Sequence, residues 1–157
     1  MHRIDPSQSS LDTADLDALA EIRRACARDI LMSTTLAGCG HPGGSLSTLD
    51  FLLVAYATLN LDPSAPAAPD RDRLIVSHGH ISPATYSMLA AAGFVSRSDF
   101  LLGFRRAGNP FGGHVETVVP GVEWSSGNLG QGLAAGAGSA IGLTNAGSPA
   151  RVVVCMG

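Results

Sequence analysis

A glycine-rich stretch from Gly121 to Gly138 constrains the fold of this chain more than any other feature. Within it, glycine stands at positions 127, 130, 132, 136 and 138, where an apolar turn opens into a predicted helix. Glycine lets a backbone bend tightly and bring its N–H groups close to a ligand. A helix that begins near Asn128 or Gly130 would also direct its free amides and its positive dipole end at an anion. The later glycines indicate that the helix packs closely against a neighbouring backbone.

Two interpretations of this stretch stay open at the level of sequence. All of the glycines could serve helix packing, and the G-x-x-G-x-G spacing taken alone favours packing over ligand binding. The spacing differs from the dinucleotide-binding fingerprint, which directly follows a strand, whereas Pro120 and Gly121 precede this stretch. We therefore expect no dinucleotide site, and phosphate binding by the turn at 127–130 is the functional alternative.

The composition is rich in small and apolar residues and poor in charge. Of the 157 residues, 45% are hydrophobic and 15% are charged, which predicts one domain with an apolar core. The 10 basic residues are all arginines without a basic stripe, and the net charge is −3, which argues against nucleic-acid binding. The three cysteines lack metal-type spacing and are typical of reduced thiols in a cytoplasmic protein. We find no signal peptide and no bilayer-spanning apolar run, so we expect no membrane partner.

Strands that alternate with helices predict an α/β fold, with a parallel central sheet flanked by helices. Residues 1–12 are expected to form a loose polar arm and residues 13–157 a single domain. Apolar residues at steps of three and four predict a long helix that begins at Asp12 or Thr13 and stops at Gly38. The other expected elements are a loop at 38–45, a helix capped at Ser47 and ending near Thr58, an exposed connection at 60–72, strands at 73–77 and 151–155, and helices at 83–92, around 100–102 and from about 128.

Four of the five histidines lie beside or near glycine in predicted loops: His41, His78, His80 and His114. Each alone is typical of an ordinary loop residue, but four in similar settings indicate a shared site. Two of them follow the strand at 73–77, and open α/β sheets bind ligands at the carboxyl ends of strands. One interpretation is a zinc site with ligands at 78, 80 and 114. The other is an anionic cofactor on the turn at 127–130, with the imidazoles as phosphate contacts and proton-transfer groups. Only the second also uses the glycines, so it is favoured.

Taken together, these motifs resemble the amino-terminal half of the transketolase family. The resemblance covers roughly residues 15–157 and rests on segments in the family's order and close to its spacing. These segments are Gly40-His41-Pro42-Gly43-Gly44-Ser45, Ser77-x-Gly79-His80, Gly113-His114-x-Glu116, and Pro120-Gly121-Val122-Glu123 through Gly127-x-Leu129-Gly130-Gln131-Gly132. The short chain is similar to split transketolases, in which the diphosphate-binding and pyrimidine-binding domains are separate subunits.

The resemblance implies a thiamine diphosphate-binding fold and a reaction that moves a two-carbon ketol unit from a ketose phosphate to an acceptor. It implies that His80 and the turn of Gly127, Asn128, Leu129 and Gly130 contact thiamine diphosphate. It also implies that His41 and His114, with His80, form the catalytic group, lining the channel near the reacting carbon and assisting proton transfer. The cofactor supplies an electron sink, and imidazoles move protons near neutral pH. The implied partner is a C-terminal subunit with the pyrimidine-binding domain, in a heterotetramer.

Departures from the family pattern leave alternatives open. The family's magnesium motif begins Gly-Asp-Gly, and Gly157 would be its first residue, so the ligands of Mg²⁺ are expected beyond Gly157 and none within this sequence. His78 stands in place of the usual Asn or Lys, and Asn128 in place of Ser or Pro. The segment Gly79–Pro83 is closer to the decarboxylating component of homodimeric pyruvate dehydrogenase. The alternatives are therefore a subunit that decarboxylates a 2-oxo acid or transfers an acyl or acyloin unit, and a non-catalytic partner domain.

Overall fold

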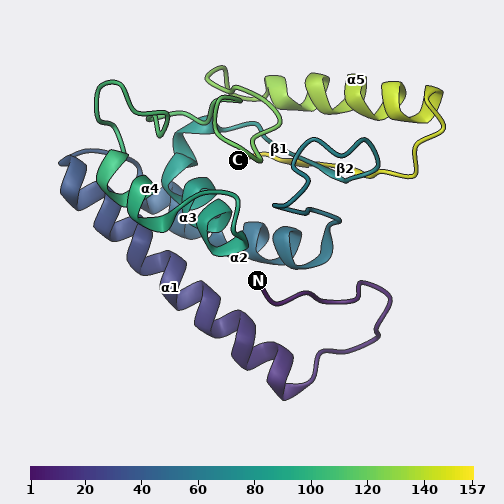
Figure 1. Ribbon diagram of the computed structural model, residues 1–157, viewed down its shortest axis with the longest axis horizontal. Helices are drawn as coiled ribbons and strands as arrows, with labels where there is room; N and C mark the ends of the chain where they lie inside the picture. The colour runs from purple at the N-terminus through teal and green to yellow at the C-terminus, as the bar shows by residue number, and fades with distance from the viewer.

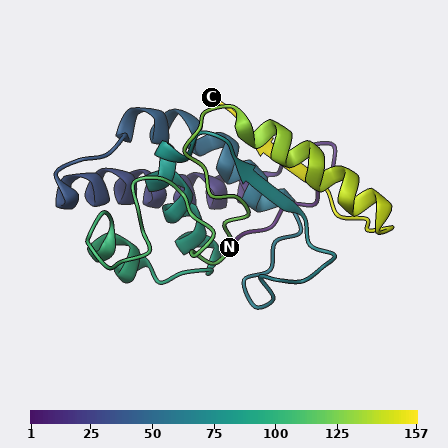
Figure 2. The ribbon, with the colours of Figure 1, turned by 90° about the horizontal axis from the view of Figure 1, so that it is seen from above.

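A two-stranded parallel sheet lies between helix α5 on one side and the remaining helices on the other in the computed structural model (Figure 1), which describes residues 1–157. The α/β class with a parallel sheet flanked by helices is confirmed. Figure 2 shows α5 running beside both strands when the molecule is seen from above. The elements in chain order are α1 (Thr13–Ala37), α2 (Pro42–Thr58), β1 (Arg73–Val76), the 3-10 turn η1 (Gly79–Ile81), α3 (Ser82–Ala92), α4 (Arg97–Gly103), α5 (Gln131–Asn145) and β2 (Val152–Cys155).

The two strands are in a register that pairs Arg73 with Val152 and Val76 with Cys155. Side chains alternate along each strand, so Leu74 and Val76 of β1 enter the main hydrophobic cluster, together with Cys155 of β2. The opposite face receives α5, whose glycines approach the intervening strand residues. Because helices cover both faces, the strands read as continuous apolar runs, as is typical of parallel sheets.

The long helix α1 has the boundaries that its sequence predicts. Asp12 is the N-cap and forms a capping box with Asp15, while Gly38 ends the helix in the left-handed conformation with φ of 67°. Its buried residues, among them Cys26 and Ile30, face α2 and α3. This confirms the predicted helix from Asp12 or Thr13 to Gly38.

Helix α2 begins five residues before the predicted capping box. Pro42 occupies its first turn and His41 is its N-cap residue, without a side-chain capping hydrogen bond. The predicted cap at Ser47 is therefore wrong, and the Ser47 hydroxyl donates instead to the Gly44 carbonyl at 3.0 Å. Proline is favoured in a first helical turn because its fixed φ suits the helix and its missing N–H has no partner there. The expected loop at 38–45 accordingly shrinks to three residues before His41.

The amino-terminal arm is held against α2 rather than loose. The Ile4 amide donates to the Ala57 carbonyl at 2.9 Å, and Arg3 donates to the carbonyls of Tyr56 and Leu59. These carbonyls lie at the C-terminal end of α2, where backbone acceptors lack intrahelical partners. The expectation of a loose polar arm is therefore wrong, because the backbone carbonyls at the end of α2 bind it.

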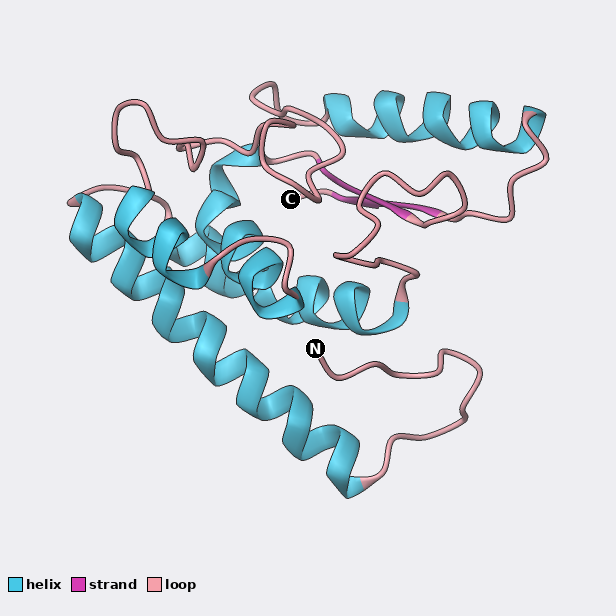
Figure 3. Cartoon of the chain, viewed as in Figure 1, coloured by secondary structure: helices cyan, strands magenta, loops and turns pink.

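The remaining expectations agree with the structure to within a few residues. Ser96 caps α4, Gly93 ends α3 in the left-handed conformation, and the glycine- and proline-rich segment between α4 and α5 is irregular (Figure 3). The core beneath this segment contains edge-to-face aromatic pairs around Tyr86, which packs on Phe100, Phe104 and Phe111. None of the helices combines the length and the apolar character needed to cross a membrane.

Candidate functional site

The candidate site begins where β1 ends. Ser77, whose amide still pairs with the Cys155 carbonyl at 2.8 Å, is followed by His78, Gly79 and His80 in a tight turn. A Cβ at Gly79 would lie 2.4 Å from the Ser126 carbonyl oxygen, so only glycine fits there. The close approach brings the segment before the glycine-rich turn directly onto the pair of histidines.

Two other segments reach the same turn. The Val115 amide donates to the Gly79 carbonyl at 3.2 Å, which places His114 beside the strand end. The Ser82 hydroxyl donates to the Gly113 carbonyl at 2.9 Å and fixes the same loop. From the other side, His41 at the start of α2 lies with its ring centroid 5.1 Å from that of His80.

The structure thus gathers all four loop histidines of the sequence analysis around one point. The rings of His78 and His80 are 5.8 Å apart at their centroids. His78 is buried, His80 is half-buried, and His41 and His114 are exposed. The fifth histidine, His2, lies apart from the cluster and contacts Asp15 of α1.

Burial and mutual proximity shape the electrostatics of the cluster. Burial, followed by the proximity of His41, His78 and His114, lowers the pKa of His80. Burial also lowers the pKa of His78, and the Cys155 carbonyl, which acts in the opposite direction, does not offset it. Nδ1 of His78 is buried without a hydrogen-bond partner. This environment therefore favours neutral imidazoles at the centre of the cluster, which can accept protons from a ligand.

The glycine-rich stretch serves both of the purposes left open by the sequence. Cβ atoms added at Gly132 and Gly136 would lie 2.6 Å from Ser77 Cβ and 2.3 Å from Val154 Cγ2, so these two glycines allow α5 to pack on the sheet. By contrast, nothing lies within 4 Å of a Cβ at Gly127 or Gly130, and both residues are exposed. The early glycines thus border open space beside the histidines.

The backbone amides that lack a hydrogen-bond acceptor precede α5 and do not belong to its first turn. The amide of Gly132 donates to Ser77 Oγ at 3.0 Å, and that of Leu133 to the Gly130 carbonyl at 3.2 Å. The four successive backbone N–H groups of residues 127–130 have no hydrogen-bond acceptor within the chain. The expectation that the helix itself supplies the donors is corrected, because Ser77 already occupies one of them. A run of free amides at a helix start is a site suited to an anion.

Several residues shape the site through contacts that the sequence does not indicate. Glu123 forms an ion pair with Arg71 and lies 3.6 Å from Arg73, and these side chains are largely buried. This ties the segment before the turn to the start of β1. Ser77 and Ser126 hold the turn against the strand end. Their partners are about fifty residues away in sequence, so spacing alone could not have identified them.

The described residues fit a diphosphate-bearing cofactor but not a metal ion. A Cβ at Gly44 would lie 3.7 Å from His80 Nε2, so glycine there leaves a cradle in front of the imidazole. Together with the free amides at 127–130, this cradle suits an anionic group. No three His, Cys, Asp or Glu side chains are arranged to hold a metal ion, so the zinc interpretation has no site among these residues.

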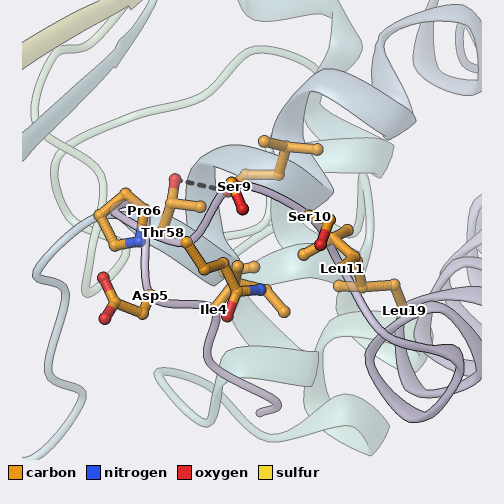
Figure 4. Close-up of a pocket in the computed structure, with 11 residues that line it drawn as sticks. Ile4, Asp5, Pro6, Ser9, Ser10, Leu11, Leu19 and Thr58 are labelled. Carbon is orange, nitrogen blue, oxygen red and sulfur yellow. Dashed lines mark hydrogen bonds between the residues drawn. The ribbon is translucent and has the colours of Figure 1, made fainter.

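A separate cavity lies away from the histidines, between the arm and helices α1 and α2 (Figure 4). Its volume is about 270 Å³, and its apolar lining includes Ile4, Leu11, Leu19 and Val54. No histidine lines it, so it is distinct from the candidate site.

Comparisons with known proteins agree with this geometry. Residues 17–149 match the family described as transketolase, thiamine diphosphate binding domain. The transketolase of Cereibacter sphaeroides is 38% identical over 136 residues, covering 81% of this chain and 20% of the relative. A 6-deoxy-6-sulfo-D-fructose transketolase subunit of a Clostridium species is 38% identical over 108 residues, covering 68% of this chain and 39% of the relative. The crystal structure of Campylobacter jejuni transketolase superimposes with a TM-score of 0.82 at 30% identity, over 93% of this chain and 24% of the other.

The chain thus spans only a fraction of the length of the relatives that it matches, about a fifth in the first of these cases. The matched region contains the histidine cluster and the glycine-rich turn, which confirms the resemblance drawn from the motifs. The chain belongs to the transketolase family, as its N-terminal, thiamine diphosphate-binding domain.

Proposed function

We propose that this chain is the diphosphate-binding part of a transketolase that moves a two-carbon ketol unit from a ketose phosphate to an acceptor. The observation that supports this most is the convergence on Gly79 of the loops that carry His41, His80 and His114, beside the free amides of residues 127–130. All the relatives reported above are transketolases or transketolase subunits, which favours a ketose donor over a 2-oxo acid.

In this proposal the chain binds the cofactor by its phosphates and manages protons at the reacting end. The amides of Gly127, Asn128, Leu129 and Gly130 and the imidazole of His80 hold the diphosphate. The exposed rings of His41 and His114 face the substrate, hydrogen-bond its hydroxyls and transfer protons. Thiamine diphosphate, when bound, supplies the electron sink that cleavage of a carbon–carbon bond next to a carbonyl requires.

The proposal includes partners that lie outside residues 1–157. The pyrimidine-binding domain is supplied either by a further part of the same polypeptide or by a separate C-terminal subunit in a heterotetramer. The Clostridium relative, which is described as a transketolase subunit, supports the second arrangement. Mg²⁺ would be held on the diphosphate by oxygen ligands from those other residues, as hard cations prefer.

The test is turnover by the full-length protein with its pyrimidine-binding partner, thiamine diphosphate and Mg²⁺, over a panel of ketose phosphates. His41→Ala, His80→Ala and His114→Ala should each lower kcat/KM by about 10²–10⁴-fold, the usual contribution of an acid–base group. His2→Ala is the matched control and should leave kcat/KM unchanged, because His2 lies on the arm against Asp15.

The alternatives predict different results in the same preparation. Release of carbon dioxide from pyruvate without turnover of any ketose would identify a 2-oxo acid decarboxylase and reject the proposal. Absence of Mg²⁺-dependent cofactor binding by calorimetry in the assembled protein would identify a non-catalytic partner domain.

A further inference from the structure

We propose that His78 is a positioning residue that joins the carboxyl end of β1 to the first turns of α2, and thereby sets the places of His41 and His80. The catalytic consequence rests on the proposed function, whereas the joint itself does not. His80 and His41 are the rings that face the ligand, and His78 acts through them.

The first evidence is the place of His78 in the sheet. It directly follows Ser77, the residue after β1 whose amide still pairs with the Cys155 carbonyl of β2, and it is only 4% exposed. A Cβ built on Gly157 would lie 3.1 Å from His78 Cδ2 and 3.3 Å from Nε2. The ring is therefore wedged between the ends of both strands, the edge at which open α/β sheets bind ligands.

The second evidence is the link from this ring to α2. Thr48 Oγ1 lies 3.4 Å from His78 Nε2 and donates its proton to the Gly44 carbonyl at 2.9 Å. Because that proton is committed, the hydroxyl is free to accept from Nε2–H. Residues 44–48 form the first turns of the helix, and Ser45 is bonded through its amide to the carbonyl of His41 at 3.2 Å. A chain of contacts thus runs from the strand end to the backbone of His41.

The third evidence is that the His78 ring has no hydrogen-bonding side chain other than Thr48. Its Nδ1 atom is buried without a hydrogen-bond partner, and the residue is only 4% exposed. The ring stands edge-to-face to His80, which in turn is edge-to-face to His41. A buried ring that contacts His80 on one side and Thr48 on the other is placed to hold them at a set distance.

The experiment uses the full-length protein with its partner and compares four single variants and the double variant His78→Phe/Thr48→Val. His78→Gln keeps a nitrogen near the position of Nε2, His78→Phe keeps a ring without nitrogens, and Thr48→Val removes the hydroxyl without changing the shape. Thr58→Val is the matched control, since its hydroxyl donates to the Val54 carbonyl at the far end of the same helix. Amide hydrogen exchange of residues 45–49 is measured without cofactor, and kcat/KM is measured with it.

We expect His78→Phe and Thr48→Val each to raise exchange at residues 45–49 about tenfold and to lower kcat/KM by a similar factor, as loss of one hydrogen bond would. The double variant His78→Phe/Thr48→Val should show the same exchange rate and the same kcat/KM as either single variant, because both substitutions remove the same contact. His78→Gln should stay within about threefold of the wild type in both measurements, and Thr58→Val should match the wild type.

Any one of three results would overturn the inference. The Thr48→Val protein could exchange its amides at the wild-type rate, the effects of the two substitutions could add in the double variant, or His78→Gln could be as impaired as His78→Phe. If His78→Phe does not fold, Thr48→Val and His78→Gln still decide it. If the wild-type protein shows no turnover, the proposed function fails, and the exchange rates alone then decide the role of His78.

Discussion

At the scale of single residues, the protonation of the candidate site depends on which histidines are buried away from solvent. Ring burial at positions 78 and 80, at the end of β1, lowers the pKa of both imidazoles. Gly79 between them allows Ser126 to approach, and that contact removes solvent from one side of the turn. The same close packing that builds the site therefore keeps its central histidines neutral.

This lowering has a consequence for stability. The unfolded chain binds protons at these positions below about pH 6.5, whereas the folded chain does so only at lower pH. The two histidines therefore contribute fully to the free energy of unfolding above about pH 6.5. This contribution should decrease as the pH falls toward the pKa values of the folded state. Urea unfolding at pH 7.5, 6.5 and 5.5 measures this, and His80→Gln should weaken the dependence. A protein that becomes more stable between pH 7.5 and 5.5 would contradict the prediction.

At the scale of elements, α5 shows that identical residues in one helix have different purposes. Gly136 faces β2, where no side chain has room, while Gly138 faces outward into open space. The spacing of the glycines is that of a helix face, but it does not indicate which face meets the sheet.

The two glycines give a matched pair of substitutions. Gly136→Ala should lower the free energy of unfolding by about 1–3 kcal/mol, because its Cβ would overlap Val154 Cγ2. Gly138→Ala should raise it by about 0.5–1 kcal/mol, because alanine is the better helix former and nothing is displaced. Denaturant unfolding of both variants checks the prediction, and equal effects would refute the orientation of α5.

The amino-terminal arm is attached to α2 by the side chain of Arg3 as well as by the backbone amide of Ile4. Arg3→Ala should lower the free energy of unfolding by about 1 kcal/mol, because the carbonyls of Tyr56 and Leu59 lose a charged donor. The arm should also become more sensitive to proteolysis. Arg24→Ala is the control and should change the free energy by less than about 0.5 kcal/mol, since its pair with Glu21 is on the surface. An Arg3 variant as stable and resistant as the control would show that the arm is held by its backbone alone.

At the scale of the whole molecule, Asp72 connects three distant segments at the start of β1. Its carboxylate accepts from the Arg151 amide at 2.7 Å, from the Arg151 side chain and from the Asn60 amide at 2.8 Å. Burial opposes ionisation of this carboxyl, but these hydrogen bonds outweigh burial and lower its pKa. The ionised group therefore stabilises the fold above its ordinary pKa, and this contribution is lost as the pH falls through the lowered value.

Asp72→Ala should lower the free energy of unfolding by about 3 kcal/mol, because it removes the buried carboxylate that accepts from the Arg151 side chain and from the backbone amides of Arg151 and Asn60. Asp50→Ala is the matched control, since Asp50 pairs with Arg23 on the surface and its loss should cost less than about 1 kcal/mol. Thermal or urea unfolding measures both variants. A loss at Asp72 no larger than at Asp50 would contradict this role.

Much of the fold could be predicted because the signals are local. The capping box at Asp12 and the stop at Gly38 bound α1, and β-branched runs mark the two strands. The start of α2 was missed because Ser47 offers a plausible cap, while the true start depends on how His41 and Pro42 leave the preceding loop. The grouping of the four histidines was also predictable, since each one lies beside or near a glycine in a predicted loop.

The sequence by itself determined the element order, the class of the fold, the family and the set of histidines around the site, because periodicity, capping and ordered motifs act over short stretches of chain. Only the tertiary structure decided which glycines pack and which stay open, which amides remain free, and which histidine is buried behind the others. These features depend on Ser77 meeting Gly132 and on Ser126 meeting Gly79. Contacts between residues about fifty positions apart arise only when the sheet and its helices close together, and no local pattern records them.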